Sequence, residues 1–159
     1  MKIKWFGTAT LIIEDNSHKI LIDPFFSYTD KRELYRKKYL DQFKGCNAIV
    51  LTHGHFDHMH EVPEIVKDNP MPIYCTQTPR DTLIRKGVDE NIINKVDAGD
   101  NFSVGDFEFI VHKGKHASFG FSLVFKTITQ RSFWKKIKLA ANIGRSAVFD
   151  EKEGGETVI

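Results

Sequence analysis

The segment Thr52–His60 reads THGHFDHMH and decides how the rest of the chain is interpreted. It holds four of the chain's seven histidines together with an aspartate. It directly follows a short apolar run, NAIVL at residues 47–51, which predicts a buried strand covered on both faces. Imidazole and carboxylate groups suit zinc and similar divalent ions. Solvated loop histidines are the alternative, but so dense a cluster at a strand end predicts a metal site.

The spacing within this segment separates the ligands into two pairs. His53 and His55 are two residues apart, so their side chains share a face of an extended segment, and Gly54 allows a tight bend between them. Asp57 and His58 follow where the chain turns toward a helix, which rotates them toward a neighbouring position. The ions of two-metal hydrolytic sites are about 3.5–4 Å apart. The spacing therefore predicts one ion at the first pair and a second ion at the second pair.

The composition predicts one globular domain. The 159 residues are 41% hydrophobic and 28% charged, and the net charge of +2 is too small to indicate a polyanionic partner. The N-terminal stretch has no apolar run long enough for a signal peptide or a membrane span, so a cytoplasmic location is expected. Cys46 and Cys75 lack the spacing of a metal or redox motif and are expected to be buried thiols.

Apolar runs and turn residues predict alternating strands and helices. Strands are expected over residues 2–6, 10–14, 19–23, 48–52, 73–76, 94–96 and 106–112, the first three antiparallel. Helices are expected over residues 30–44, 63–68 and 79–86. Gly45 and Gly87 are placed to end the first and last of these helices. This rhythm is typical of an α/β layer.

The motif and its flanks resemble a known superfamily. THGHFDH is similar to the HxHxDH signature of the metallo-β-lactamase-fold hydrolases, and KIKWFGTATLIIE followed by KILIDPF resembles their first strands. The similarity runs from about Met1 to about Ser118, and its general flavour is closest to the small hydrolases similar to ascorbate-phosphate lactonases. The resemblance implies an α/β fold: the N-terminal half of a four-layer αββα sandwich. It would be a single partial domain over residues 1–159, truncated or completed by another chain.

The resemblance also implies a role for each polar residue of the motif. His53 and His55 would bind a first metal together with a third histidine after a later strand, a place that His116 matches. Asp57 and His58 would bind a second metal, and Asp57 is the residue expected to act in catalysis. The expected metal is zinc, one or two ions per chain, with manganese or iron as alternatives.

Three further polar residues have roles with alternatives. Asp23 would accept a hydrogen bond that orients a ligand imidazole, or it would simply end a strand before a proline turn. His112 competes with His116 for the third position at the first ion. His60 is interpreted as a surface or supporting residue and not as a ligand.

The second half of the superfamily pattern has no counterpart in this sequence. In the family it supplies a bridging aspartate and a last histidine, whereas no histidine follows His116 here. The late carboxylates are Asp150, Glu151, Glu153 and Glu156. Without that half a sheet face and a strand edge would lack cover, so a homo-oligomer or a complementing chain is expected.

A basic segment lies over residues 118–149 and is expected to be helical. It mixes lysines and arginines with apolar residues and contains no acidic residue. Its apolar face could pack on the core, while its charge could attract an anionic substrate or contact an anionic membrane surface. It lacks a motif for nucleic acid, which is not expected as a partner.

Two functions compete at this point. The first is a metal-dependent hydrolase that uses a metal-bound hydroxide on a small ester, lactone or phosphodiester. The second is a catalytically incomplete homologue that acts as a metal-binding or assembly module, because the second ion lacks two of its ligands. Metal content and turnover would distinguish the two functions.

Overall fold

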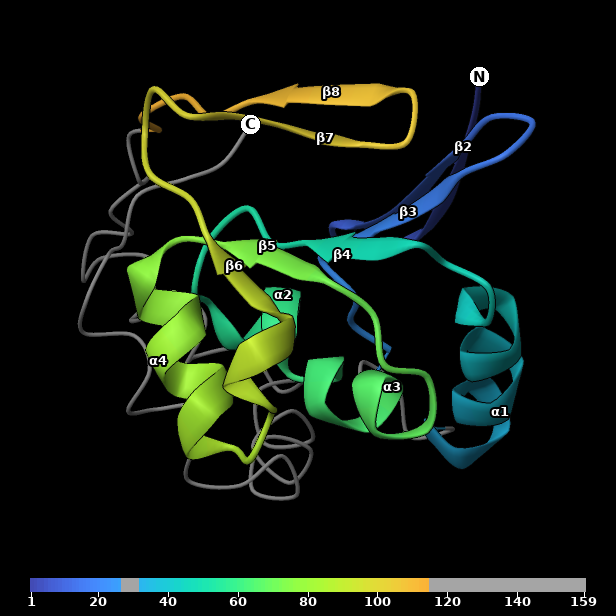
Figure 1. The fold of residues 1–159 in the computed structure, drawn as a ribbon. Coiled ribbons are helices and arrows are strands. Elements are labelled where there is room, and N and C mark those ends of the chain that lie inside the picture. Colours follow the sequence, from blue (N-terminus) through green and yellow to red (C-terminus); the bar gives the residue numbers. More distant parts are fainter. Residues whose placement is uncertain (27–31, 115–159) are drawn as a thin grey trace, which may run out of the picture.

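The computed structural model describes residues 1–26 and 32–114, which form three layers (Figure 1). Helices cover one face of a six-stranded sheet, and a two-stranded hairpin lies over the other face. His116, the late carboxylates and the basic segment 118–149 lie outside the described residues. The described layers are those expected for the N-terminal half of an αββα sandwich, so the predicted α/β fold class is confirmed.

The helices and strands follow the predicted alternating pattern, with an additional strand at Asn101–Val104 that was not expected. The strands are β1 (Lys2–Gly7), β2 (Thr10–Glu14), β3 (Lys19–Ile22), β4 (Ala48–Val50), β5 (Ile73–Cys75), β6 (Ile93–Lys95), β7 (Asn101–Val104) and β8 (Phe107–Ile110). The helices are α1 (Arg32–Phe43), α2 (Phe56–Met59), α3 (Val62–Asp68), α4 (Gln77–Arg85) and the 3-10 turn η1 (Glu90–Ile92). None of the described helices is long and apolar enough to cross a membrane.

The six-stranded sheet begins antiparallel and continues parallel. Its strand order is β1-β2-β3-β4-β5-β6, with antiparallel pairing up to β3 and parallel pairing from β3 onward. Parallel strands need crossover connections, which here carry the helices of the first layer. As a result, the carboxyl ends of β3, β4 and β5 meet at one edge of the sheet. Segments that leave a parallel sheet at this edge commonly carry the functional groups.

The main core lies between the sheet and the helices. Alternate residues of the central strands point into it, and Leu21, Ile49 and Ile73 are fully buried there. Phe43 of α1, Met59 of α2 and Leu83 of α4 close it from the helix side. Burial of each such side chain stabilises the fold by about 1.5–3 kcal/mol. The free thiols of Cys46 and Cys75 are buried as expected, and burial raises their pKa to about 11 and about 12.

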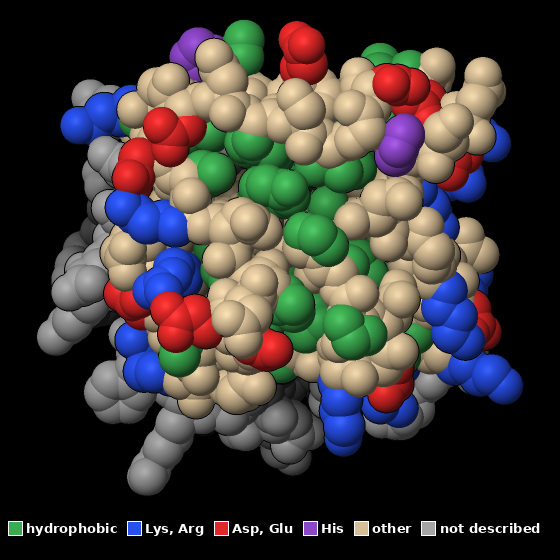
Figure 2. All heavy atoms as spheres, in the orientation of Figure 1, with side chains coloured by type: hydrophobic (Ala, Val, Ile, Leu, Met, Phe, Trp, Pro, Cys, Tyr) green, Lys and Arg blue, Asp and Glu red, His purple; other side chains and the backbone are tan. Residues whose placement is uncertain are grey.

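A second, smaller core joins the hairpin β7–β8 to the other face of the sheet. Tyr74 of β5 stacks on Phe102 of β7 with ring centroids 4.3 Å apart, and Phe102 stacks on Phe109 of β8 at 4.8 Å. Val111, which is 1% exposed, packs with Val50 on the sheet. Apolar side chains accordingly gather across the middle of the face seen in Figure 2, below the hairpin. The hairpin therefore starts a second sheet layer.

The hairpin leaves the edge strand β1 uncovered on this face of the sheet. Ile3 and Trp5 of β1 lie on the hairpin side, since Ile3 pairs with Ile13, which in turn pairs with Ile20 of the second core. They are 58% and 71% exposed. Large apolar side chains on an edge strand are a common contact surface.

Candidate metal centre

The motif segment leaves the sheet where the hydrogen bonds of β4 change partner. The amide of Leu51 still donates to the carbonyl of Tyr74 at 2.9 Å, as in a regular ladder. The next amide, that of Thr52, donates instead to Oδ1 of Asp23 at 2.8 Å. The strand was expected over 48–52 but ends at Val50, because a side chain replaces the neighbouring strand as the acceptor.

The histidines are carried by a bend and a single helical turn that are firmly packed. Gly54 is buried, and a Cβ there would lie 3.2 Å from Cγ2 of Thr78, so the bend presses against the start of α4. His55 is the residue before α2, and Met59 of that helix is fully buried. Phe56 meets Phe25 edge to face at 5.8 Å. The sequence predicted a turn toward a helix here, and α2 is that helix.

The four side chains predicted to be ligands in this segment lie together. The ring centroids of His53 and His58 are 3.9 Å apart, and those of His53 and His55 are 4.6 Å apart. Nε2 of His58 lies 3.9 Å from Oδ1 of Asp57. All four side chains are half-buried at the carboxyl end of β4. His53 thus lies next to His55, its partner in the first predicted pair, and also next to His58 of the second pair. The two pairs therefore form a single group.

Asp23 supports this group from the end of β3. Its side chain is 2% exposed and its backbone adopts φ 45°, in the left-handed region that few residues enter. The fully buried Thr10 holds this conformation. Its hydroxyl donates a hydrogen bond to the carbonyl of Asp23 at 2.8 Å and accepts one from the amide of Phe25 at 2.9 Å. The carboxylate is thereby turned toward the motif.

His58 is bound to that carboxylate. Nδ1 of His58 lies 2.8 Å from Oδ2 of Asp23, which matches the contact expected of a residue that orients a ligand imidazole. Burial by itself would lower the pKa of His58, but the hydrogen bond to Asp23 and the charges of Asp23 and Asp57 raise it above its ordinary value. The carboxylates of Asp23 and Asp57 therefore favour positive charge at this place.

The donor set of the motif fits a divalent ion in its chemistry. It offers three imidazoles and a carboxylate. In the neutral form of His58, the contact with Asp23 places the ring proton on Nδ1 and leaves the lone pair on Nε2 for a ligand role. The motif side chains do not present three ligand atoms within 4.8 Å of one another. Among the described residues only Asp15, His18 and Asp106 do so, at the turns of two hairpins. There Oδ1 of Asp15 accepts the amides of Ser17 and His18, which closes the turn.

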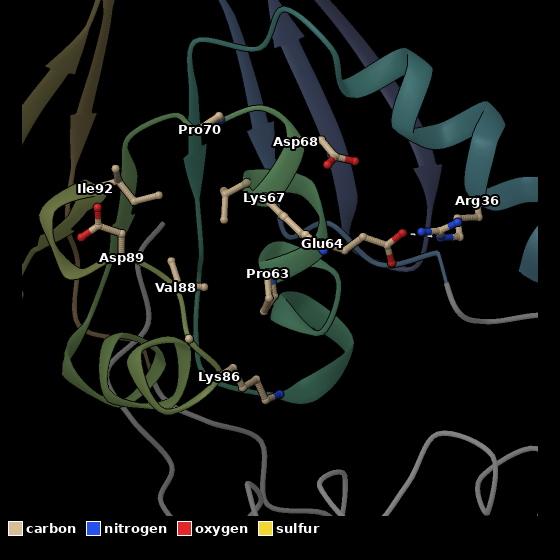
Figure 3. A pocket seen from close by; sticks show the side chains of 12 residues that line it. Arg36, Pro63, Glu64, Lys67, Asp68, Pro70, Lys86, Val88, Asp89 and Ile92 are labelled. Atoms are coloured by element: carbon tan, nitrogen blue, oxygen red, sulfur yellow. Dashed lines mark hydrogen bonds and ion pairs between the residues drawn. The ribbon is translucent and has the colours of Figure 1, made fainter.

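A cavity of about 630 Å³ lies elsewhere, between α3 and the segment that follows α4 (Figure 3). It opens between α3 and η1, and its lining includes Val66, Val88 and Ile92. Figure 3 shows Glu64 joined to Arg36 at its rim by a salt bridge. None of the motif residues lines it, so it is not the substrate side of the metal centre.

Comparison with known proteins agrees with this arrangement. Residues 18–134 match the model of the beta-lactamase superfamily domain, a span that contains the whole motif and Asp23. The chain belongs to the metallo-β-lactamase-fold superfamily. The resemblance seen in the sequence is therefore confirmed.

Named relatives within this superfamily are similar to the chain over two thirds or more of its length. A UPF0173 metal-dependent hydrolase of Rhizobium johnstonii is 31% identical over 118 residues, which cover 74% of this chain and 49% of that protein. One from Staphylococcus aureus is 32% identical over 111 residues, or 69% of this chain and 46% of that protein. The chain thus spans about half the length of the curated relatives it matches.

A solved structure supports the fold of this superfamily member. Igni18, a metallo hydrolase of Ignicoccus hospitalis, superposes with a TM-score of 0.56 at 22% identity. The match covers 74% of this chain and 50% of that one. At this identity the likeness concerns the fold, and it agrees with an N-terminal half.

Two residues of the centre were missed in the sequence. Thr10 binds the backbone of Asp23, and Thr52 binds its carboxylate and contacts the histidines. Nothing about a threonine at a strand end distinguishes it from an ordinary strand residue. The only available signal was that Thr52 directly precedes His53. His112 is exposed just beyond β8, and the choice between it and His116 stays a prediction.

Proposed function

We propose that the chain is the metal-binding half of a metal-dependent hydrolase. The observation that carries the proposal is the buried Asp23 carboxylate bound to Nδ1 of His58. This histidine is one of three clustered imidazoles at the carboxyl end of a parallel strand. A buried carboxylate that orients an imidazole has a clear use in a metal site, where ligand histidines need such a partner. The metal-dependent hydrolases among the relatives support the same function.

In this proposal the ligands are those that the sequence predicted. His53 and His55 hold a first ion with His116, and Asp57 and His58 hold a second. Zinc is the first choice, with manganese and iron as alternatives. When bound, the ion activates water and polarises the oxygen under attack. The protein's own part is to aim the imidazoles and, through Asp57, to assist the proton transfer at the water.

The substrate class follows from this chemistry. An activated water attacks a carbonyl or phosphoryl centre, so the proposed substrates are small esters, lactones or phosphodiesters. The basic residues of 118–149 would favour an anionic one. Because the chain spans about half the length of its relatives, the remaining ligands of the site would come from polypeptide that this sequence does not contain.

The test combines metal content with turnover. Purified chain would be loaded with zinc, manganese or iron(II) and assayed by elemental analysis, then incubated with 4-nitrophenyl acetate, a γ-lactone and bis(4-nitrophenyl) phosphate. His53→Ala and His58→Ala should each lower metal content and turnover, whereas His60→Gln, outside the ligand set, should leave both near wild type. A chain that binds none of the three metals would show that the ligand assignments are wrong.

A metal-binding or assembly module is the second candidate, favoured because the motif side chains do not present three ligand atoms within 4.8 Å of one another. It predicts one ion or none per chain and no turnover on any substrate of the panel. Two ions per chain with turnover that is lost in His58→Ala would exclude it.

A further inference from the structure

The hydroxyl of Thr52 lies at the centre of the polar group. Its Oγ1 is 2.7 Å from Oδ2 of Asp23 and 2.9 Å from Nδ1 of His53. Nδ1 of His58 lies farther away, at 3.4 Å, and makes its short contact with Asp23 instead. One hydroxyl therefore connects the carboxylate to a second imidazole.

The chemistry of these groups fixes the direction of each hydrogen bond. An ionised carboxylate only accepts, so the single proton of the Thr52 hydroxyl is donated to Asp23. The hydroxyl oxygen can then only accept from the ring of His53, which requires the proton of that ring to be on Nδ1. The lone pair of a neutral ring in this tautomer is on Nε2.

We propose that Thr52 is a positioning residue that fixes the tautomer and the ring orientation of His53, as Asp23 does for His58. Both imidazoles then depend on one oxygen, Oδ2 of Asp23, which binds His58 directly and His53 through the Thr52 hydroxyl. The inference rests on the proposed function for the purpose of this arrangement, namely two Nε2 atoms prepared for metal. The tautomers themselves exist without it.

The hydroxyl is held in place before any ion binds. The amide of Thr52 is bound to Oδ1 of Asp23 while its hydroxyl is bound to Oδ2, so the residue grips the carboxylate at two points. Threonine is β-branched, and its χ1 is restricted. A serine would keep the hydrogen bonds with more rotational freedom, and a valine would keep the shape without them.

The first test reads the tautomers in metal-free protein. Long-range ¹H–¹⁵N NMR at a pH above the histidine titrations distinguishes protonated from unprotonated ring nitrogens. Wild type should show His53 and His58 protonated on Nδ1. In Thr52→Val, His53 should move toward the Nε2-protonated form that imidazoles favour in water, while His58 stays unchanged; Thr52→Ser should restore His53. Thr82→Val, which removes a buried hydroxyl bound to Arg85, should change neither ring.

The second test is a zinc titration against a chelator. Thr52→Val should weaken the affinity by about 10–100-fold, the usual effect of losing a supporting contact, and Thr52→Ser should recover most of it. The proposal is overturned if His53 of wild type carries its proton on Nε2, a result that needs no variant to fold, or if Thr52→Val leaves its tautomer unchanged. A wild-type chain that binds no metal but shows the expected tautomers would refute the proposed function and leave the Thr52 assignment standing.

Discussion

At the scale of single residues, the centre depends on one aspartate in an unusual backbone conformation. Asp23 has φ 45°, and its carboxylate accepts from the Thr52 amide, the Thr52 hydroxyl and His58. Only a short polar side chain reaches these donors from a left-handed backbone, which asparagine and aspartate tolerate better than other non-glycine residues. Both the backbone conformation and the need for a charged acceptor therefore favour aspartate at position 23.

Asp23→Asn separates these two requirements. The backbone should be retained, but the amide group cannot accept from His58 and the Thr52 hydroxyl in the same way, so zinc affinity should fall by about 10–100-fold. The measurement is a chelator competition on folded protein, with the surface variant Asp41→Asn as a control. Unchanged affinity would mean that the carboxylate does not support a ligand.

The stability of metal-free protein should depend on the protonation of His58. Because its pKa is raised in the folded state, the charged ring stabilises the fold fully below the ordinary pKa of 6.5, and this contribution is lost as pH rises through the raised value. Urea unfolding at about pH 6 and about pH 8 should show the loss in wild type and a smaller one in His58→Gln. Excess zinc should reverse the trend, since the ion competes with the proton.

The ligand-type residues could be predicted from the sequence because their spacing is local, whereas their supporting contacts are long-range. THGHFDH places its side chains within a few residues of one another. The partners Asp23 and Thr52 are 29 positions apart, and Thr10 is 13 from Asp23. Which threonine meets which carboxylate depends on the register of three strands, and a single sequence does not contain that register.

At the scale of elements, the strands with strong apolar runs were predicted and the weak one was not. β7 was not among the strands expected from the sequence, although it carries Phe102 of the stacked aromatic column. Its residues alternate between exposed and half-buried, and its short run, NFSV, lies between two turn signals. Its partner β8 and the face of Tyr74 stabilise it, so its formation is a tertiary effect.

The hairpin turn should be sensitive to a single methyl group. Gly105 has φ 59°, and a Cβ there would lie 2.2 Å from the ring of His18. Gly105→Ala should therefore cost about 1 kcal/mol or more in urea unfolding, because the backbone is strained and the ring must move. In a His18→Ala background the steric part should disappear and only the backbone part should remain. Equal costs in both backgrounds would show that the two turns do not touch.

At the scale of the whole molecule, the exposed side chains of β1 indicate how the chain could associate. Trp5 and Ile3 form an apolar edge beside the area that the hairpin covers. We expect the chain to sediment as a dimer or larger species, and Trp5→Lys to shift it toward the monomer. Asn16→Lys, which adds the same charge at an exposed turn, should not. A wild-type chain of monomeric mass at micromolar concentration would contradict this expectation.

The hydrogen bond from the Thr52 amide to Asp23 has a consequence for how the centre could be monitored. That amide lies directly after the β4 ladder, yet its acceptor is a side chain of another strand and not a carbonyl. Its hydrogen exchange would therefore report the local opening of the centre apart from the melting of the sheet, which the Leu51 amide reports one residue earlier. The ratio of the two protection factors would measure how firmly the protein holds its histidines, with no substrate and no metal required.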